Sequence, residues 1–488
     1  MLDELHVQAA LALPLAFTLL CRFAQGFVDL AVVGRLLGTD ALAGASLALT
    51  FLFSMTNVVT GSCGDATAAL CAQALGAGEP RLCGAWLQLG MLSSSAAVLL
   101  VLAPAWAFVG VPLRALGAGE RVAQLAELFA RASIPRMLLH VNYYAFKMFL
   151  AAQRRLAPDV LGNVAGMAAG VAANVLLVGG TCAVGVAAEV GGASTAPACW
   201  RGLGFVGAPL AGTLARALVI ALVVALALFG PASWRPATEA LSGGWALHAG
   251  PAGALRGDRV RHFLALALPS AGRAALDQGV ALGLALLAGS LGAASAGAHN
   301  ALVELFAIAC ALAWAIGDAV MVRVGRALGA GDAAGARRAA AVGVAAGAAY
   351  ALLAPAVLLP LAPLLGALFS SDHAVLSVSA ATAPAMAALV SSSALLFPLL
   401  GVATAQGASG ARGAARAWLA GTAVIVPMAW GLGIARGLGV PGLWSAWAAG
   451  YCAAATGIAI LVARADWEAL AVEALSKTRA AGGKEEGG

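Results

Sequence analysis

Long apolar runs separated by short polar connections dominate the chain. A helix needs about 20 apolar residues to cross a bilayer, and each run is long enough for one crossing. Runs near thirty residues should tilt or extend beyond the hydrocarbon. The pattern predicts twelve spans, at 8–33, 41–63, 83–110, 122–151, 157–181, 203–230, 262–290, 294–322, 337–367, 375–405, 413–435 and 440–463.

The composition agrees with this pattern. Of the 488 residues, 62% are hydrophobic and 10% are charged, whereas soluble domains carry about a quarter charged residues. A chain this apolar is expected to fold in a bilayer. The formal net charge of +6 is then explained by basic loops on one side of the membrane, and nucleic-acid binding is not expected.

The longest non-apolar interval divides the chain into two halves of six spans. It covers 231–261 and is rich in Gly, Pro and Arg. We therefore expect a first lobe over 1–230, an inter-lobe loop over 231–261, a second lobe over 262–465 and a polar tail over 466–488.

The two halves also share short sequences. Gly64-Asp65-Ala66, followed by Ala74-Leu75-Gly76-Ala77-Gly78, recurs 253 positions later as Gly317-Asp318-Ala319 and Ala327-Leu328-Gly329-Ala330-Gly331. Leu11-Ala12-Leu13-Pro14 recurs as Leu266-Ala267-Leu268-Pro269. Six spans separate the copies, so both halves have the same orientation in the membrane. The predicted fold is an all-α polytopic membrane protein whose twelve transmembrane helices form two six-helix lobes related by a pseudo-two-fold axis normal to the membrane. Two lobes that rock against each other are typical of transporters.

Basic residues are distributed unevenly between the two sides of this topology. With the N-terminus in the cytoplasm, 17 Lys and Arg residues fall in cytoplasmic segments. The opposite side holds five: Arg35, Arg114, Arg121, Arg201 and Arg436. The positive-inside rule therefore predicts that both termini are cytoplasmic. A plasma membrane and a vacuole-like membrane both remain open.

Motifs for enzymatic chemistry are not supported. Gly202-x-Gly204-x-x-Gly207 fits the dinucleotide fingerprint, but that motif needs a preceding β-strand, and here membrane spans lie on both sides. The sequence contains no Walker A, HExxH, GxSxG or CxxC motif. We expect no enzyme, no cofactor and no metal site. Cys182 and Cys199 flank a Gly-rich segment, and a disulfide between them is left open.

Several motifs together resemble one family, the multidrug and toxic compound extrusion (MATE) transporters, over nearly the whole chain. The first span carries an acid five residues before a glycine, spans four and five carry Gln, Pro and Asn at family spacings, and the rest lie in the second half. The residues are Gly26-Phe27-Val28-Asp29 with Gly34, Gln153, Pro158, Asn174, Gly297-Ala298-His299-Asn300, Val303-Glu304-Leu305, Val322-Arg323-Val324-Gly325-Arg326 and Gly439-Val440-Pro441-Gly442-Leu443-Trp444-Ser445.

The resemblance implies an antiporter driven by H⁺ or Na⁺. Such a protein exports organic cations or amphipathic compounds through a central cavity between the lobes. Carboxylates in spans one, seven and eight would couple the ion, and their positions here are Asp29, Asp277 and Glu304.

The depth of these acids supports the same role. A charge at the bilayer centre costs about 2.5–3.5 kcal/mol, so such residues usually face a cavity or a partner. Asp277 lies mid-span, and Glu304 lies about 16 Å into its span. An ionised carboxylate holds an organic cation and a protonated one does not, which couples cargo to protons. The alternatives are a local pair of Asp277 with Arg273, a hydrogen bond of Glu304 with Asn300, and an interfacial position for Asp29.

Other polar or aromatic residues inside the spans have weaker assignments. Asp65 and Asp318 are expected near the cytoplasmic helix ends, where an acid reaches water, and Asp318 could pair with Arg323. His299 is expected to be hydrogen-bonded or interfacial. Arg216 either pairs with an acid of the first lobe or lines the cavity. Candidate cavity-lining residues are Asn174, Gln278, Asn300, Arg216, Tyr143 and Trp314.

Span ten departs from the family pattern. Many members carry an acid at the position of Leu395, where this chain has Ser391, Ser392 and Ser393 nearby. This absence disfavours a Na⁺ site that needs the acid and favours H⁺. Na⁺ coupling and organic-anion export stay open as alternatives. A lipid or lipid-linked oligosaccharide flippase also stays open, because Arg22, Arg216 and Arg273 lie in spans. So does a passive channel.

Overall fold

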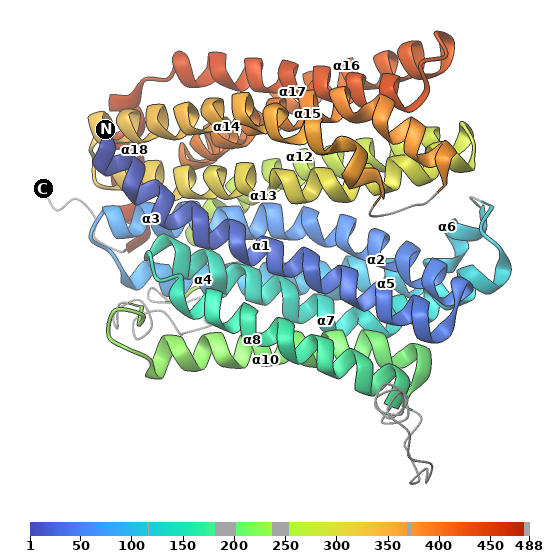
Figure 1. Cartoon of the computed structure of the whole chain (residues 1–488). Coiled ribbons are helices and arrows are strands. Elements are labelled where there is room, and N and C mark those ends of the chain that lie inside the picture. Colours follow the sequence, from blue (N-terminus) through green and yellow to red (C-terminus); the bar gives the residue numbers. More distant parts are fainter. Residues whose placement is uncertain (116, 181–201, 237–252, 368–371, 483–488) are drawn as a thin grey trace, which may run out of the picture.

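The structure is a computed structural model that describes residues 1–115, 117–180, 202–236, 253–367 and 372–482. Within these ranges every regular element is a helix (Figure 1). The candidate disulfide between Cys182 and Cys199 lies outside the described residues.

The first lobe contains six spans, and three of them contain a π-helical turn. Thr60–Gly64 joins α2 to α3, Val98–Leu102 joins α4 to α5, and Val175–Gly179 follows α8. Its helices are α1 (Leu2–Leu37), α2 (Thr39–Val59), α3 (Asp65–Gly76), α4 (Arg81–Ala97), α5 (Ala103–Ala107), α6 (Gly110–Ala115), α7 (Glu120–Ala152), α8 (Ala157–Asn174) and α10 (Gly207–Phe229).

The second lobe repeats this arrangement. Its helices are α12 (Gly257–Ser290), α13 (Ala293–Gly329), α14 (Ala333–Ala367), α15 (His373–Ala405), α16 (Ala408–Met428) with the π-helical Ala429–Ala435, and α17 (Gly439–Ala463). In Figure 1 the blue-to-green first lobe occupies the lower part of the view and the yellow-to-red second lobe the upper part.

The described helices account for the predicted spans. Ten helical segments are both long and apolar enough to cross a membrane. The two further spans, α7 and α12, are 33 and 34 residues long and carry several charges each. The predicted all-α fold with two six-helix lobes is confirmed.

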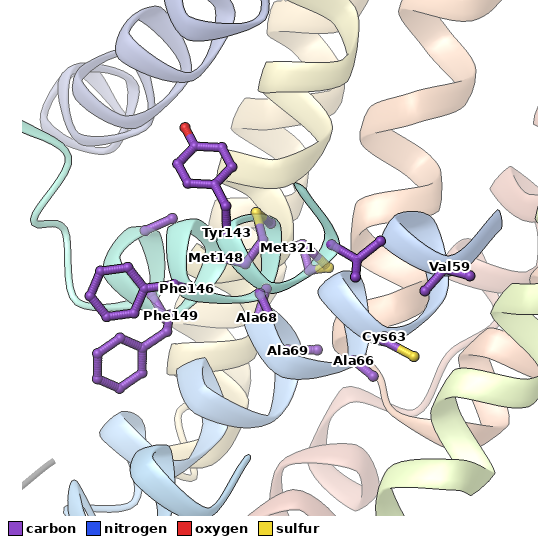
Figure 2. Close-up of a cluster of buried hydrophobic side chains, with 14 of the residues drawn as sticks. Val59, Cys63, Ala66, Ala68, Ala69, Tyr143, Phe146, Met148, Phe149 and Met321 are labelled. Carbon is purple, nitrogen blue, oxygen red and sulfur yellow. The ribbon is translucent and has the colours of Figure 1, made fainter. Parts of the chain in front are cut away.

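The lobes share one hydrophobic core at one end of the bundle. Met1 and α18 lie at this end, which we call the terminus end (Figure 1). Here the α13 residues from Ala315 onward pack into the same cluster as α3 and α7, and Met321, Ala68 and Met148 are among its members (Figure 2). The α13 residues from Leu302 to Cys310 belong to a separate cluster within the second lobe. The lobes are therefore packed together more closely at the terminus end.

The predicted polar tail contains a helix that packs on both lobes. α18 (Trp467–Gly482) contacts α13, α14 and α3. The Arg259 guanidinium donates to the Ala481 carbonyl at 3.0 and 2.9 Å, and Arg256 donates to the Ala480 carbonyl at 2.8 Å. Because these carbonyls lie in the last turn of α18, the two arginines satisfy groups that have no partner within the helix.

Candidate functional site

One face of α13 follows the boundary between the lobes. At 3.6 residues per turn, the side chains of this face leave the helix within about 40° of one common direction. It carries Asn300, Glu304, Trp314, Asp318, Gly325 and Gly329.

This face contacts the first lobe over only part of its length. The Trp314 ring lies 6.3 Å from that of Phe23 on α1. Nearer the terminus end, a methyl group added to Gly325 would lie 3.2 Å from the Cβ of Ala72. Toward the opposite end, Asn300 and Glu304 are exposed. The printed contacts of this face with the first lobe thus reach from the terminus end to Trp314, and beyond Trp314 the residues Asn300 and Glu304 are exposed. We call the space in front of this exposed part of α13 the cleft.

The terminus end is closed by the repeated glycine motif. A methyl group on Gly76 would lie 2.0 Å from the Arg326 carbonyl oxygen, and one on the equivalent Gly329 would lie 2.0 Å from the Gln73 carbonyl oxygen. Only glycine permits this approach of two helix backbones. The sequence that recurs 253 positions apart is therefore the contact between the lobes.

Polar contacts reinforce the closed end. Gln73 donates to the Ala405 carbonyl at 2.9 Å, and Gln8 donates to the Ala339 carbonyl at 2.8 Å. Arg323 donates to both carboxylate oxygens of Glu4 at 2.8 and 2.6 Å. The expected pair of Asp318 with Arg323 is wrong, because the Arg323 guanidinium is turned toward α1.

Asp65 and Asp318 lie deeper than predicted. Each is followed by eleven more helical residues, to Gly76 in α3 and to Gly329 in α13, which is about 16 Å of helix. The expectation that they sit at helix ends is wrong, because both helices continue well past the apolar run. Both side chains are half-buried.

The acid of α12 lies against an aromatic wall of the second lobe. Asp277 is half-buried and accepts a hydrogen bond from the Tyr451 hydroxyl at 2.7 Å. The Tyr451 ring packs 5.3 Å from Trp418. One turn nearer the terminus end, the Arg273 guanidinium lies 5.1 Å from the Trp418 ring centre. In the described part of the chain Arg273 makes no ion pair with Asp277, so the alternative of a local ion pair is not found.

The remaining second-lobe candidates differ in their surroundings. Glu304 and Asn300 are exposed, and the expected hydrogen bond between them is not found among the described residues. Gln278 is half-buried. Trp314 packs edge-on against Phe397 at 5.8 Å. His299 accepts a hydrogen bond from the Trp444 indole at 3.1 Å, as the hydrogen-bonded interpretation predicted.

Asp29 of the first lobe is buried in a polar network. Its side chain is 2% exposed, so it is enclosed by protein groups. The Asn174 amide donates to it at 2.6 Å, and the Arg136 guanidinium lies 2.9 Å from its other oxygen. Gly212 of α10 makes room for Arg136, because a methyl group there would lie 2.5 Å from the guanidinium.

A second buried network surrounds Asp159. The Tyr143 hydroxyl donates to its carboxylate, and the Asn163 amide donates to it at 3.1 Å. The Lys147 ammonium lies 3.9 Å from the carboxylate and donates to the Thr18 hydroxyl at 2.7 Å. Asp159, Lys147 and Arg136 are functional candidates that the sequence motifs do not indicate. The available signal was an ionisable residue at the start of an apolar run or inside one.

Arg216 lines a pocket between α1, α7, α8 and α10. Its side chain is 5% exposed, and the guanidinium lies 4.9 Å from the Tyr143 ring centre. Arg22, His140 and Lys147 line the same pocket. No acid forms an ion pair with Arg216 among the described residues. The pocket that it lines lies inside the first lobe, so its predicted role in the central cavity stays a prediction. No group of three or more His, Cys, Asp or Glu residues that could hold a metal occurs in the same ranges.

Comparisons with known proteins agree with this architecture. The MatE family model matches residues 14–176 and 269–430. Probable multidrug resistance protein NorM from Bradyrhizobium diazoefficiens is 29% identical over 455 residues, which cover 91% of this chain and 89% of NorM. Protein DETOXIFICATION 52 from Arabidopsis thaliana is 27% identical over 489 residues, which cover 96% and 86% of the two chains.

A solved structure shares the fold. The crystal structure of the eukaryotic MATE transporter AtDTX14 matches with a TM-score of 0.85 at 22% identity, covering 98% of this chain and 99% of that one. The family model matches one stretch in each lobe and well over half of the chain in total. The chain therefore belongs to the MatE family of multidrug and toxic compound extrusion transporters.

Proposed function

We propose that this multi-pass membrane transporter exports organic cations in exchange for protons, with Asp277 and Glu304 as the carboxylates shared by cargo and proton, and with Asp29 as a further coupling carboxylate. The observation that carries the proposal is the position of Asp277. Its carboxylate is half-buried, lies against aromatic rings and forms no ion pair among the described residues.

The surroundings of Asp277 suit an organic cation. Trp418 and Trp447 pack against Tyr451 with ring centres 5.3 and 6.1 Å away, and all three rings are buried. They form an apolar wall behind the carboxylate, where the low dielectric strengthens its attraction for a cation. A carboxylate beside such rings supplies the opposite charge. Glu304, exposed on the cleft face of α13, supplies a second carboxylate that a cargo molecule can reach.

Exchange follows from competition for the same oxygen atoms. Protonation removes the negative charge that holds the cation, so proton binding releases cargo. A net cycle also needs the cleft to open alternately at each end. The glycine contact and the Glu4–Arg323 pair close the terminus end, and we take that end as cytoplasmic because the predicted loops there are the basic ones.

The proposal is tested in proteoliposomes with radiolabelled tetraethylammonium and an imposed pH gradient. We expect accumulation of the cation against its own gradient and its loss in Asp277→Asn and Glu304→Gln. Glu473→Gln, which removes an exposed carboxylate of α18, is the control and should transport normally. The same vesicles with a Na⁺ gradient and no pH gradient test the alternative coupling ion.

Other outcomes would point elsewhere. Equilibration without accumulation would identify a channel. Movement of labelled lipid but of no cation would identify a flippase. Normal transport in both carboxylate variants would refute the assignment of the exchange site.

A further inference from the structure

A cavity of about 560 Å³ lies between the first turns of α1 and α8, at the terminus end of the first lobe. Its volume falls within the range of about 300–1,000 Å³ that is usual for ligand sites. Ala10 and Leu161 line it and are exposed, so it opens at the side of the lobe. We call it the lateral groove. Its apolar lining comes from two helices: Val7, Ala10, Leu11 and Pro14 of α1, and Val160 and Leu161 of α8.

The lateral groove reaches from the membrane surface into the apolar layer. Val7 and Pro14 lie seven positions apart on α1, which is about 10 Å along the helix. The predicted spans of these two helices begin at 8 and 157, so the groove lies at lipid depth and its mouth lies at the boundary with water. An apolar groove that opens sideways at this depth meets acyl chains rather than water.

The mouth of the groove is basic. Arg154, which precedes α8, lines it. The neighbouring Arg155 donates to the Ser233 carbonyl, and Arg235 donates to the Gly230 carbonyl at 2.7 Å. Of these three arginines, Arg154 is the one whose guanidinium makes no hydrogen bond or ion pair with the described residues. A charged donor thus faces the groove without a protein partner in this part of the chain.

The acids near the mouth do not neutralise this charge. Glu4 already accepts two hydrogen bonds from Arg323, at 2.8 and 2.6 Å. Asp3 lies one turn before Val7, is exposed and forms no ion pair among the described residues. Partial burial and the charges of Arg323 and Arg326 lower the pKa of Arg154, against the opposing charge of Glu4. Positive charge is therefore in excess around Arg154.

Arg154 also has a backbone conformation that favours glycine. Its φ is 60°, and it is the one non-glycine residue with a positive φ in the described part of the chain. Counted from the matching Gln153 and Gln406, the equivalent residue of the second lobe is Gly407, with φ 81°. Both lobes make the same turn, but the first lobe places a side chain there at a cost in stability. Such strain is typical of residues whose side chains have a function.

From these observations we propose that the lateral groove binds an anionic phospholipid from the leaflet at the terminus end, with its phosphate at Arg154 and one acyl chain between α1 and α8. A guanidinium binds phosphate through two parallel hydrogen bonds. Trp234 also lines the groove, and tryptophan suits the boundary between headgroups and chains. We take this leaflet as the cytoplasmic one, where anionic lipids gather at basic sites between helices. The site is additional to the proposed function, because its occupant is a resident lipid rather than cargo.

Native mass spectrometry of the full-length protein in detergent tests the proposal. The probes are phosphatidylglycerol and phosphatidylcholine with identical acyl chains, which differ in headgroup charge. We expect the first phosphatidylglycerol to bind more tightly than the first phosphatidylcholine. Arg154→Gly should weaken phosphatidylglycerol binding about tenfold or more, whereas Arg154→Lys, which keeps the charge, should lose less. Glycine adopts a positive φ without strain, so Arg154→Gly should unfold at the wild-type temperature or above it, and misfolding cannot explain its loss of lipid.

Two matched controls separate the headgroup from the acyl chain. Arg337→Gln removes an exposed arginine of α14 that does not line the groove, and it should leave the affinity unchanged. Ala10 and Ala265 are equivalent, each four residues before a matching proline, but Ala265 does not line the groove. Ala10→Trp fills the groove and should weaken phosphatidylglycerol binding, whereas Ala265→Trp should not. Asp277→Asn should bind the lipid normally, so failure of the proposed function and failure of this proposal give different results.

Four results would overturn the proposal. The first is equal affinity of the wild-type protein for the two lipids. The second is unchanged phosphatidylglycerol affinity in Arg154→Gly, and the third is unchanged affinity in Ala10→Trp. The fourth is complete displacement of phosphatidylglycerol by an equal concentration of glycerol 1-phosphate, which carries the phosphate without acyl chains. That result would mean that the mouth binds a free phosphate ester and that the groove holds no chain.

Discussion

The glycine contact at the terminus end predicts how a single methyl group should change the conformation of the transporter. In Gly329→Ala the new methyl would lie 2.0 Å from the Gln73 carbonyl oxygen. Non-bonded heavy atoms need well over 3 Å, so the helices must separate by about 1 Å or more. Forcing extra volume into a packed contact costs about 1–3 kcal/mol. The closed terminus end should therefore lose about 5- to 150-fold in population relative to states in which it opens.

Double electron–electron resonance measures this shift directly. Spin labels at Arg81 on α4 and Arg337 on α14 are exposed and lie on different lobes. We expect Gly329→Ala to move the distance distribution toward longer values. Gly272→Ala is the control, because that glycine is also helical but has open space around it, and it should leave the distribution unchanged.

The pseudo-symmetry sharpens the same prediction. Gly76→Ala should act like Gly329→Ala, because its methyl would meet the Arg326 carbonyl oxygen at the same 2.0 Å. One separation of the helices relieves both clashes, so the double variant should shift the distribution by much less than the sum of the single shifts. Wild-type distances in both single variants would refute the role assigned to this contact, and additive effects would refute the shared movement.

Three further predictions concern side chains. Arg323→Gln should destabilise the closed conformation of the terminus end by about 1 kcal/mol, because a partly exposed ion pair is lost. The exchanged pair Glu4→Arg with Arg323→Glu should restore the wild-type distances between the spin labels. Asp29→Asn should destabilise the protein by about 3–5 kcal/mol, because Arg136 remains charged and buried without its partner. Adding Arg136→Met should restore the thermal unfolding temperature, and no restoration would contradict the pairing. Tyr451→Phe should lower tetraethylammonium affinity severalfold, because it removes the 2.7 Å hydrogen bond that orients Asp277. Tyr350→Phe, which loses a hydrogen bond to the Ala309 carbonyl, is the control and should leave the affinity unchanged. Equal losses in both variants would argue against a local effect at Asp277.

The lobes and their repeat were predictable from the sequence because hydrophobic length and short duplicated motifs are local properties. The depth of Asp65 and Asp318 was not. The predicted apolar spans end at 63 and 322, close to these residues, whereas the helices continue to Gly76 and Gly329. Since the lobes cover this extension, its polar residues are satisfied by the other lobe rather than by water, and hydropathy alone does not detect that arrangement.

Side-chain partners were the least predictable feature. Helical spacing suggested that Arg273 would pair with Asp277, but Arg273 lies over Trp418 and Asp277 binds Tyr451. Both partners come from helices more than 140 positions further along the chain. A spacing rule compares only residues on one helix, so it cannot weigh partners that packing brings from elsewhere.

The positions that the two halves share and those at which they differ have different physical roles. Gly76 and Gly329 are both retained because each lies against the backbone of the other lobe, and a side chain on either one would separate both contacts. Counted from the matching prolines Pro14 and Pro269, Arg22 and Asp277 stand at equivalent positions with opposite charge. No contact between the lobes among the described residues requires these two to match, so the charge inside each lobe can differ while the glycine contact stays the same. Closure of the terminus end is thus a property of the symmetric pair, whereas the charge inside each lobe is set by residues that the repeat does not share.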